Sequence, residues 1–435
     1  MLHRLLLALA LASSHAVAGP SPRATIEQGL RQFVEAGGAP GLTAAFITPQ
    51  GVQYYSFGAI ADEPKRGLDE HTEFAVASIS KLFTTLALAD MAREGKLHFE
   101  DTVEQHLPQG VPMPSKDGKA ITLANLATHT SGIPTDADWG KTSAMSWGKA
   151  MKEVFQRPLE SVPGARFKYN NMGMALLGHI GELVDGRPYE EMVQARVLRP
   201  LGMRDTWVAP PDAAKASAGA FKAGILAPAG GFSSNAVDLA KFAAAALGGA
   251  PGTLPQAFEI SYLPQGKDEG GRPLHLGWHE GGNPKQLNHT GRNNVYLGID
   301  LKRHVAVVII CTDQTLQIGG LGQAALTALG GGKGDFPKPD KIIALSEREL
   351  QAYAGEYRYQ SAGTVQLKAD PKRGVLLLAF DGKGETVLWP GEDRTFHCKE
   401  WHCDLKFSEA AGGKSPKVDI AMDGWSGNYA RVAGK

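Results

Sequence analysis

The chain has 435 residues, of which 43% are hydrophobic and 21% are charged, a composition typical of a globular protein with a sizeable core. Its 45 lysines and arginines balance its 45 aspartates and glutamates, which excludes a strong overall field that would attract nucleic acid or an anionic membrane. We therefore expect no nucleic-acid partner.

The N-terminal segment 1–18 is typical of a secretory signal peptide. His3 and Arg4 precede a short apolar run, and small residues form a cleavage site after Ala18. The run is too short to span a bilayer, and no cysteine follows the site to carry a lipid. A buried N-terminal helix is the alternative. We expect an exported protein, periplasmic or secreted, without a stable membrane anchor.

The next part of the chain, residues 19–330, mixes helical and strand patterns. Residues 24–37 have helical periodicity that ends in a Gly-Gly pair, and residues 42–60 are typical of a β-hairpin around a Pro-Gln-Gly turn. Residues 100–170 are rich in Gly, Pro, Ser and Thr, which predicts loops that frame a cleft. The remaining patterns predict helices at 78–96, 171–186, 238–249 and 321–332, and a buried strand at 304–313.

The pattern changes after residue 330. Residues 331–339 are rich in Gly, Pro and Lys and have no periodicity, which is typical of a linker. Residues 340–435 then hold short strand-like runs separated by turn residues, which predicts a small β-barrel or sandwich. The runs are GEYRYQ, TVQLKAD, GVLLLAF, ETVLWP, RTFHC, CDLKF, KVDIAM and NYARV.

The chain has three cysteines. Cys311 ends an apolar strand-like run and is expected to be a buried core thiol. Cys398 and Cys403 lie in HCKEWHC, beside His397 and His402. A metal cluster and a short disulfide both fit this segment. We favour the disulfide, because the protein is expected to be exported and a zinc site would need a second ligand pair.

A lysine interrupts the apolar run FAVASISKLF at residues 74–83. Residues i and i+3 share one face of a helix, so Ser78 and Lys81 can touch while Ser80 points elsewhere. A serine hydroxyl needs a base before it can attack, and a lysine can be that base when burial lowers its pKa. The S-x-x-K pattern alone also occurs by chance on solvated helix faces, so its interpretation depends on further motifs.

Further motifs are present and occur in a consistent order. They are FAVASISK, ITLANLATHTSGIP (121–134), PGARFKYNNMGMALLG (163–178), VLRPLGMRDT (197–206), AGGFSSNAVDLAKF (229–242) and NHTG (288–291). Together they resemble the serine β-lactamase and penicillin-binding protein superfamily. The resemblance is to the branch of class C β-lactamases, D-Ala-D-Ala carboxypeptidases and related esterases and D-aminopeptidases, and it covers nearly all of residues 22–330.

The resemblance implies roles for four residues. Ser78 would be the acylated nucleophile and Lys81 its partner in proton transfer. Tyr169 would be a general acid and base, with its pKa held low by Lys81 and His289. Asn171 would donate or accept a hydrogen bond with the substrate amide or with Lys81.

The segment His289-Thr290-Gly291 stands where many relatives carry Lys-Thr-Gly, and the histidine form resembles that of some D,D-carboxypeptidases and D-aminopeptidases. Gly291 would let the substrate backbone approach the strand closely. The backbone N–H groups of Ser78 and Arg292 would form the oxyanion hole. Because histidine titrates near neutrality, we expect a histidine-like limb in the pH profile that His289→Lys removes.

Other features are less consistent with this pattern. Arg292 stands where relatives carry small residues, so it either selects a substrate carboxylate or narrows the pocket. The segment 233–235, Ser-Ser-Asn, mimics the S-x-N motif of other branches but is expected to lead into a helix. In the segment 128–131, Thr-His-Thr-Ser, i and i+2 neighbours do not face each other on a helix, so a supporting loop is expected. The sequence lacks G-x-S-x-G and H-E-x-x-H motifs and a glycine-rich phosphate loop.

The expected fold is α/β (α+β): a β-lactamase/transpeptidase-like antiparallel sheet flanked by helices, a helical subdomain, and a small C-terminal β-barrel that resembles lipocalin-like modules. The expected enzyme is a serine hydrolase that cleaves D-amino-acid peptides, peptidoglycan fragments or small esters, with slow β-lactam acylation and no metal or other cofactor. A non-hydrolytic penicillin sensor and a peptidoglycan-binding scaffold are the alternatives. The barrel would trim the cleft, bind a partner or only stabilise the protein.

Overall fold

The computed structural model describes most of the chain. The described residues are 22–60, 63–135, 139–208, 223–283, 285–292, 294–313, 318–339, 342–359, 363–380, 385–398, 403–409, 413–422 and 425–432. The predicted signal peptide therefore lies outside the described residues. No helix in these ranges is long and apolar enough to cross a membrane.

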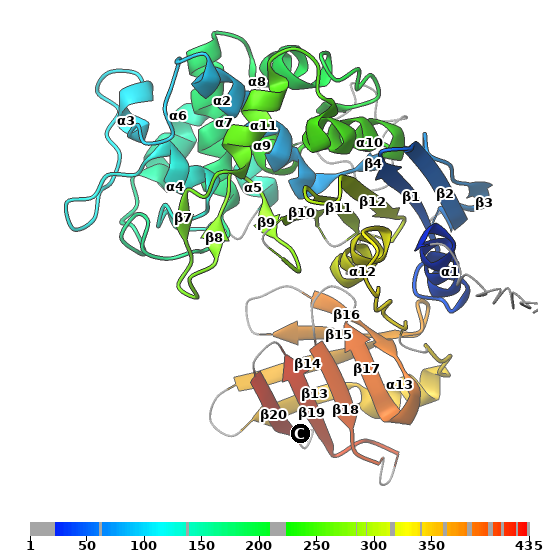
Figure 1. Cartoon of the computed structure of the whole chain (residues 1–435). Coiled ribbons are helices and arrows are strands. Elements are labelled where there is room, and N and C mark those ends of the chain that lie inside the picture. Colours follow the sequence, from blue (N-terminus) through cyan, green and yellow to red (C-terminus); the bar gives the residue numbers. More distant parts are fainter. Residues whose placement is uncertain are drawn as a thin grey trace, which may run out of the picture.

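The centre of the first domain is a seven-stranded antiparallel sheet that joins the two ends of the domain (Figure 1). The N-terminal hairpin pairs with the late strand β12, in a register that runs from Leu42 opposite Cys311 to Ile47 opposite Ala306. All of β12 is buried, which explains its unbroken apolar sequence. In spatial order the strands are β3 (Glu63–Gly67), β2 (Gly51–Ile60), β1 (Gly41–Thr48), β12 (Val305–Cys311), β11 (Val295–Asp300), β10 (Gln286–Gly291) and β9 (His279–Glu280).

Helices cover both faces of this sheet. One face packs against α1 (Pro22–Glu35) and α12 (Gly319–Leu329), which contact each other and enclose a core of aliphatic side chains. The other face packs against α10 (Ala236–Ala244) and is continuous with the larger core of the helical region. Strands β9 and β10 therefore form the sheet edge that faces the helical region.

The helical region is built around α2 (Ser80–Arg93), which is buried on nearly all sides. Helix α7 (Asn171–Asp185), α9 (Ala227–Gly230) and α11 (Leu254–Tyr262) pack around it, and Gly186 ends α7 in the left-handed conformation with φ of 74°. The shorter helices are α3 (Val103–His106), α4 (Leu123–Ala127), α5 (Trp139–Ser143), α6 (Trp147–Ala150), α8 (Tyr189–Val193) and the π-helical segments Met151–Phe155, Gln194–Leu198 and Ala245–Gly249.

The C-terminal domain is a closed eight-stranded antiparallel barrel, which lies below α12 in Figure 1. Alternate side chains fill its interior, and Leu350 of α13 (Glu347–Tyr353) is fully buried among them. Arg431 lies 4.8 Å from the ring centre of Tyr357 and donates to carbonyls next to α13. The strands are β13 (Gly355–Tyr359), β14 (Gly363–Asp370), β15 (Val375–Phe380), β16 (Glu385–Pro390), β17 (Thr395–Cys398), β18 (Cys403–Phe407), β19 (Lys417–Met422) and β20 (Trp425–Arg431).

These elements confirm the predicted hairpin, the buried strand and the eight C-terminal strands. Several helix boundaries differ from the predictions, including the starts of two helices. The predicted helix 78–96 begins as a 3-10 turn, Ala77–Ile79, so Ser78 precedes the α-helix proper. The predicted helix 238–249 begins earlier, at Ala236, because the side chain of Asn235 accepts the N–H of Asp238 and caps the first turn.

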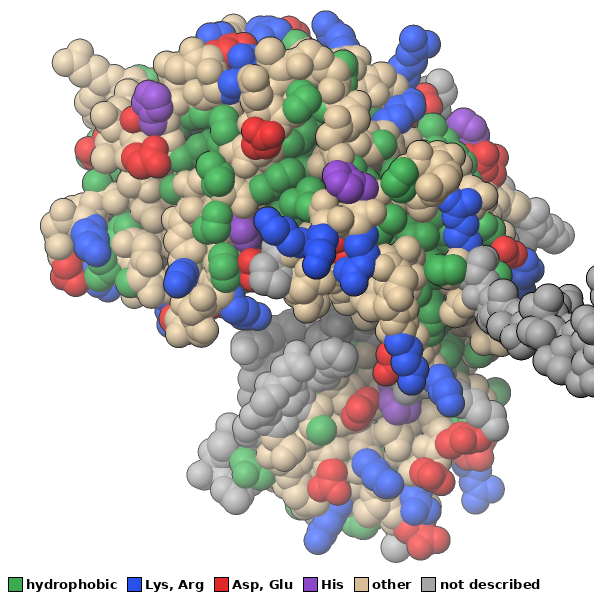
Figure 2. All heavy atoms as spheres, in the orientation of Figure 1, with side chains coloured by type: hydrophobic (Ala, Val, Ile, Leu, Met, Phe, Trp, Pro, Cys, Tyr) green, Lys and Arg blue, Asp and Glu red, His purple; other side chains and the backbone are tan. Residues whose placement is uncertain are grey.

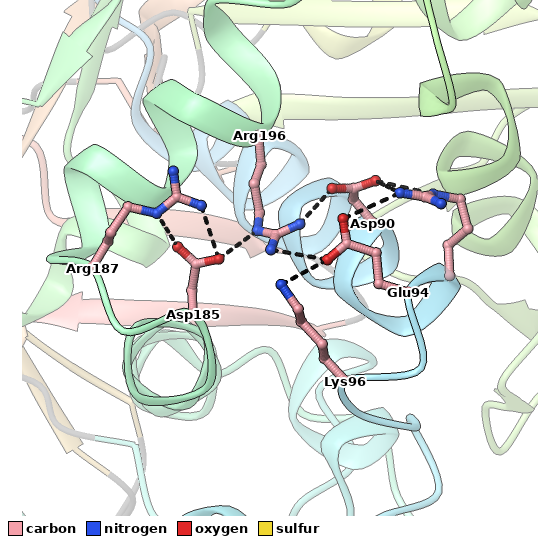
Figure 3. A network of polar contacts seen from close by, with 7 residues as sticks. Asp90, Glu94, Lys96, Asp185, Arg187 and Arg196 are labelled. Atoms are coloured by element: carbon pink, nitrogen blue, oxygen red, sulfur yellow. Dashed lines mark hydrogen bonds and ion pairs between the residues drawn. The ribbon is translucent and has the colours of Figure 1, made fainter.

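A buried ion network ties α2 to α7 and to the π-helical segment Gln194–Leu198 (Figure 3). The guanidinium of Arg196 donates to Asp185 at 2.7 Å, to Asp90 at 2.6 Å and to Glu94 at 3.1 Å. Only 6% of the Arg196 side chain is exposed. Hydrogen bonds from Arg196 and Lys96 lower the pKa of Glu94 to about 2. The network therefore holds the helix that follows Ser78 against its neighbours.

Arg196→Met should destabilise the protein by about 3–5 kcal/mol, because it removes the buried cation that three carboxylates share and leaves them only their more exposed partners Arg93, Arg187 and Lys96. Urea denaturation at neutral pH measures this change. Arg199→Met, an exposed arginine one turn further on, is the control and should change stability by less than about 0.5 kcal/mol. An equal loss in the two variants would contradict the role of the network.

The same network sets an acid limit on stability. The pKa of Glu94 is about 2 in the folded protein against an ordinary value of 4.5, so its contribution is complete above 4.5 and is lost as the pH falls toward 2. We expect the unfolding free energy of Arg196→Met to depend less on pH over this window than that of the wild type. Parallel slopes in the two proteins would disprove this linkage.

Candidate active site

Ser78 lies in the 3-10 turn Ala77–Ile79, directly before α2. The turn begins with the left-handed residue Ala77, at φ of 44°. Ser80 fixes it, because its hydroxyl donates to the Ala77 carbonyl at 2.6 Å and accepts the N–H of Phe232 at 3.1 Å. The prediction that Ser80 points away from Lys81 is thus confirmed, and Ser80 has a structural partner of its own.

Lys81 is completely buried in the first turn of α2. Its Nζ atom lies 2.8 Å from Oγ of Ser78 and donates to the carbonyl of Ala229 at 2.6 Å. No carboxylate pairs with it in the described ranges of the chain. Burial therefore lowers the pKa of Lys81 well below its ordinary value of 10.5. A neutral amine at this position can accept the proton of the Ser78 hydroxyl.

Tyr169 contacts the same hydroxyl from the other side of the cleft. Its phenol donates to Oγ of Ser78 at 2.7 Å, and its ring centre lies 4.8 Å from Nζ of Lys81. Although 37% of the residue is exposed, burial of the phenol raises the pKa of Tyr169 to about 12. The expectation of a lowered pKa was wrong, because burial disfavours the charged phenolate. Tyr169 is a proton donor in the resting site.

Asn170 and Asn171 begin α7. Asn170 accepts the N–H groups of Met172 and Gly173 and so caps the helix. The Oδ1 atom of Asn171 is buried and has no partner among the described residues. No hydrogen bond joins Asn171 to Lys81 in the described structure, so the substrate amide is the alternative that stays a prediction.

His289 lies on β10 and is 2% exposed. Its Nδ1–H group donates to the carbonyl of Thr290 at 2.8 Å, so Nε2 carries the lone pair, and this atom is buried without a partner in the described structure. Burial, with the nearby His279 and Lys81, lowers the pKa of His289 well below 6.5. The expectation that His289 titrates near neutral pH was therefore wrong, because burial disfavours the charged imidazolium.

Strand β10 ends close to the turn that carries Ser78. A Cβ atom on Gly291 would lie 2.1 Å from the carbonyl oxygen of Val76, so only glycine permits this approach. Thr290 is half-buried beside it. Arg292 follows in the left-handed region at φ of 48°, with its side chain exposed. The strand end that holds Arg292 is therefore brought to the turn that holds Ser78.

Two histidines join this site that the sequence analysis did not assign to it. The ring of His129 lies 4.4 Å from that of Tyr169, and its Nδ1 atom accepts the N–H of Asn170 at 3.2 Å. The ring of His279 lies 4.8 Å from that of His289, because β9 pairs with β10 in register. Burial lowers the pKa of both, to about 4 for His279. The motif His-Thr-Ser-Gly at residues 129–132 could have indicated from the sequence that His129 belongs to the site. No local motif indicates His279, which reaches the site only because β9 pairs with β10.

The remaining candidate motifs lie elsewhere. The segment 233–235 ends a short strand and caps α10, as expected, so it supplies no S-x-N motif. Cys311 is a buried free thiol, as predicted. Cys398 and Cys403 are also free, on the adjacent strands β17 and β18, so the favoured disulfide is not formed. His402 lies outside the described residues, within which no group of ligands could hold a metal.

The sequence profile of the family described as Beta-lactamase matches residues 26–328. The chain belongs to the Beta-lactamase family. The match covers the sheet, the helical region and every residue of the candidate site, and it ends before the C-terminal barrel.

One relative of this Beta-lactamase family member is the D-alanyl-D-alanine-carboxypeptidase/endopeptidase AmpH of Escherichia coli K12. The two sequences are 32% identical over 147 residues, which cover 32% of this chain and 37% of AmpH. The chain matches less than half the length of this relative and of a Pseudomonas fluorescens Beta-lactamase.

Solved structures support the fold. The octameric penicillin-binding protein homologue from Pyrococcus abyssi has a TM-score of 0.60 at 21% identity and covers 93% of this chain and 99% of its own. EstCE1, described as a hydrolase with promiscuous acyltransferase activity, has a TM-score of 0.59 at 19% identity and covers 71% of this chain and 99% of its own. At these identities the likeness shows the fold alone.

Lys81→Met should lower the rate of Ser78 acylation by about 10²–10⁴-fold, because it removes the buried amine without adding a charge. Stopped-flow acylation by a chromogenic ester measures this rate. Lys168→Met removes an exposed lysine beside Tyr169 and should leave the rate nearly unchanged. If the two variants lose the same activity, Lys81 is not the base.

The pH profile of acylation should lack a histidine limb near 6.5, because burial lowers the pKa of His289 well below that value. Activity should instead fall as the pH drops through the lowered pKa of Lys81, where the amine becomes protonated. Profiles of the wild type and His289→Lys check this. A wild-type limb near 6.5 that the variant lacks would restore the original expectation from sequence.

Proposed function

We propose that the protein is an exported serine hydrolase that forms an acyl-enzyme on Ser78. The observation that carries this proposal is the position of Oγ of Ser78, 2.8 Å from Nζ of the buried Lys81 and 2.7 Å from the phenol of Tyr169. A nucleophile that contacts an amine whose pKa is lowered by burial and a protonated phenol has a base and an acid within hydrogen-bond distance. Export rests on the sequence of residues 1–18.

In the first step, Lys81 accepts the proton of Ser78 as Oγ attacks the carbonyl carbon of an amide or ester. The carbonyl oxygen becomes an oxyanion, which accepts the backbone N–H groups of Ser78 and Arg292. The close approach of Gly291 to the Val76 carbonyl supports this assignment, since it brings the strand end before Arg292 near the turn that holds Ser78. Thr290 and the Oδ1 atom of Asn171 bind the substrate backbone.

The tetrahedral intermediate then collapses and the leaving group departs. Tyr169 donates its proton to the leaving nitrogen or oxygen, and the proton held by Lys81 restores the phenol. Water hydrolyses the acyl-enzyme in a second step, in which the same groups move protons in reverse order. His289 and His279 remain neutral beside this path, so they add no positive charge that would raise the cost of protonating Lys81.

We infer that the substrates are D-amino-acid peptides, peptidoglycan fragments or small esters, of which an amide or ester bond is cleaved. β-Lactams should acylate Ser78 slowly. AmpH is named as a carboxypeptidase and endopeptidase, which supports the peptide class. EstCE1 is described as a hydrolase with promiscuous acyltransferase activity, which supports a broader acyl range. The candidate site needs no metal or cofactor for these steps.

Mass spectrometry after incubation with a fluorescent penicillin tests the proposal. A peptide that contains Ser78 should carry the adduct in the wild type and not in Ser78→Ala. Ser115→Ala, a serine in a loop distant in sequence, should label like the wild type. A penicillin adduct that persists in Ser78→Ala would disprove the assignment of Ser78 as the nucleophile. A burst of acylation without turnover on esters and D-peptides would instead indicate a sensor that binds penicillin.

A further inference from the structure

His129 lies in the turn that follows α4 and is a member of the site that the proposed steps do not use. Histidine side chains are visible at the surface of the molecule (Figure 2), where water can solvate both ring nitrogens. His129 is 4% exposed, so its ring atoms depend on partners within the protein. Its backbone is left-handed, with φ of 58°, which costs free energy in a residue other than glycine. A strained and buried residue beside reactive groups is a candidate for a functional role.

His129 holds the chain on both sides of Tyr169. Its carbonyl accepts the N–H of Lys168 at 2.8 Å, and its Nδ1 atom accepts the N–H of Asn170 at 3.2 Å. The centre of its imidazole ring also lies 4.4 Å from that of the phenol ring. The residues before and after Tyr169 are thus bound to one histidine, and the phenol that contacts Ser78 lies beside its ring.

The turn that carries His129 is itself fixed by α4. The hydroxyl of Thr128 donates to a carbonyl of α4 at 2.7 Å and lies 3.0 Å from the hydroxyl of Thr130. The side chain of Asn125, on α4, donates to Thr130 at 3.2 Å. The helix therefore supports the turn, and His129 passes this support to the segment that holds Tyr169.

The phenol ring of Tyr169 borders open space. Together with Trp278, His279 and Glu280 it lines a pocket of about 270 Å³. The 37% exposure of Tyr169 means that packing does not enclose the residue on all sides. A tyrosine with room to move needs a further restraint to keep its hydroxyl 2.7 Å from Oγ of Ser78.

The contacts of His129 also define its tautomer. Burial lowers the pKa of His129 well below 6.5, which favours the neutral ring. A neutral imidazole has one acceptor nitrogen and one N–H group, so acceptance at Nδ1 places the hydrogen on Nε2. The Nε2 atom is buried and has no partner among the described residues. His129 therefore carries two local costs, a left-handed backbone and an unpaired donor, which a residue kept for packing alone would not need.

We propose that His129 is a positioning residue for Tyr169, which holds the phenol where it can donate its proton to the leaving group. The inference rests on the proposed function, in which the bond from the carbonyl carbon to the leaving oxygen or nitrogen breaks as that atom takes the phenol proton. A misplaced phenol slows this step most when the leaving group is a strong base. The choice of leaving group therefore reports on the position of Tyr169.

Two butyrate esters test the inference. The alkoxide that leaves ethyl butyrate needs a proton, whereas p-nitrophenyl butyrate releases a stable phenolate that needs none. His129→Phe keeps an aromatic ring but removes the acceptor for the N–H of Asn170. It should lower the ratio of kcat/KM for the ethyl ester to that for the p-nitrophenyl ester about tenfold. An unchanged ratio would overturn the inference.

His129→Asn separates the acceptor from the ring. Asparagine tolerates the left-handed conformation and places Oδ1 near the position of Nδ1, so the ratio should stay within about threefold of the wild-type value. A ratio as low as that of His129→Phe would contradict the role of the acceptor, and the inference would fail. Glu160→Gln removes an exposed ion pair with Lys168 on the same segment. It is the matched control and should have the wild-type ratio.

A double-mutant cycle checks that His129 acts through Tyr169. Tyr169→Phe removes the phenol proton and should lower kcat/KM for ethyl butyrate about 10²–10⁴-fold. In this background His129→Phe should lower the value by less than about twofold more, because no phenol is left to position. A further loss as large as that in the wild-type background would mean that His129 acts elsewhere, and its assigned role would be wrong.

The inference and the proposed function fail in distinguishable ways. If both esters are cleaved through Ser78 and His129→Phe leaves their ratio unchanged, the hydrolase assignment stands and the role of His129 falls. If Ser78 is acylated neither by penicillin nor by an ester, the proposed function falls first. Both esters are measured on one preparation of each variant, so a smaller folded fraction cancels in the ratio and cannot imitate the expected result.

Discussion

The chemistry proposed for this protein depends on one constraint: the amine of Lys81 is buried, and no carboxylate among the described residues pairs with it. In water a lysine is charged at neutral pH and is no base. In the first turn of α2 the charged form would lose its hydration and gain no counter-ion, so the neutral form is favoured. Its contacts to Ser78 and to the Ala229 carbonyl then hold the lone pair and the hydroxyl in one place.

Much of the surrounding structure preserves that environment. Helix α2 is enclosed by α7, α9 and α11, and the ion network of Arg196 ties its far end to α7. A charged side chain can be buried when oppositely charged groups pair with it, as the carboxylates of Asp90, Glu94 and Asp185 do with Arg196. At Lys81 no carboxylate of the described structure balances the amine, so its pKa is lowered. We propose that this makes Lys81 a reactive group instead of a structural one.

Neutrality also characterises the histidines of the site. Burial lowers the pKa of His129, His279 and His289, so in the proposed reaction these histidines add no charge that opposes protonation of Lys81. This arrangement explains why a histidine can stand where many relatives carry a lysine in the third motif. Burial likewise raises the pKa of Tyr169, because it disfavours the charged phenolate.

The sequence by itself determined the elements and the reactive motif. Periodicity predicted the hairpin, the buried strand β12 and the eight strands of the barrel, because those patterns follow from which face of each element is buried. The spacing of Ser78 and Lys81 predicted their contact, because three residues of helical chain bring side chains to one face. The order of the motifs predicted the family.

Only the tertiary structure decided the protonation states and the shape of the pocket. The pKa of Tyr169 and that of His289 depend on desolvation by residues far away in the chain, which no local pattern encodes. His279 and Glu280 enter the site because β9 pairs with β10, and that pairing was not visible in a two-residue strand. Burial and counter-ions are set by packing between distant segments, and these two quantities decide which charges the site keeps.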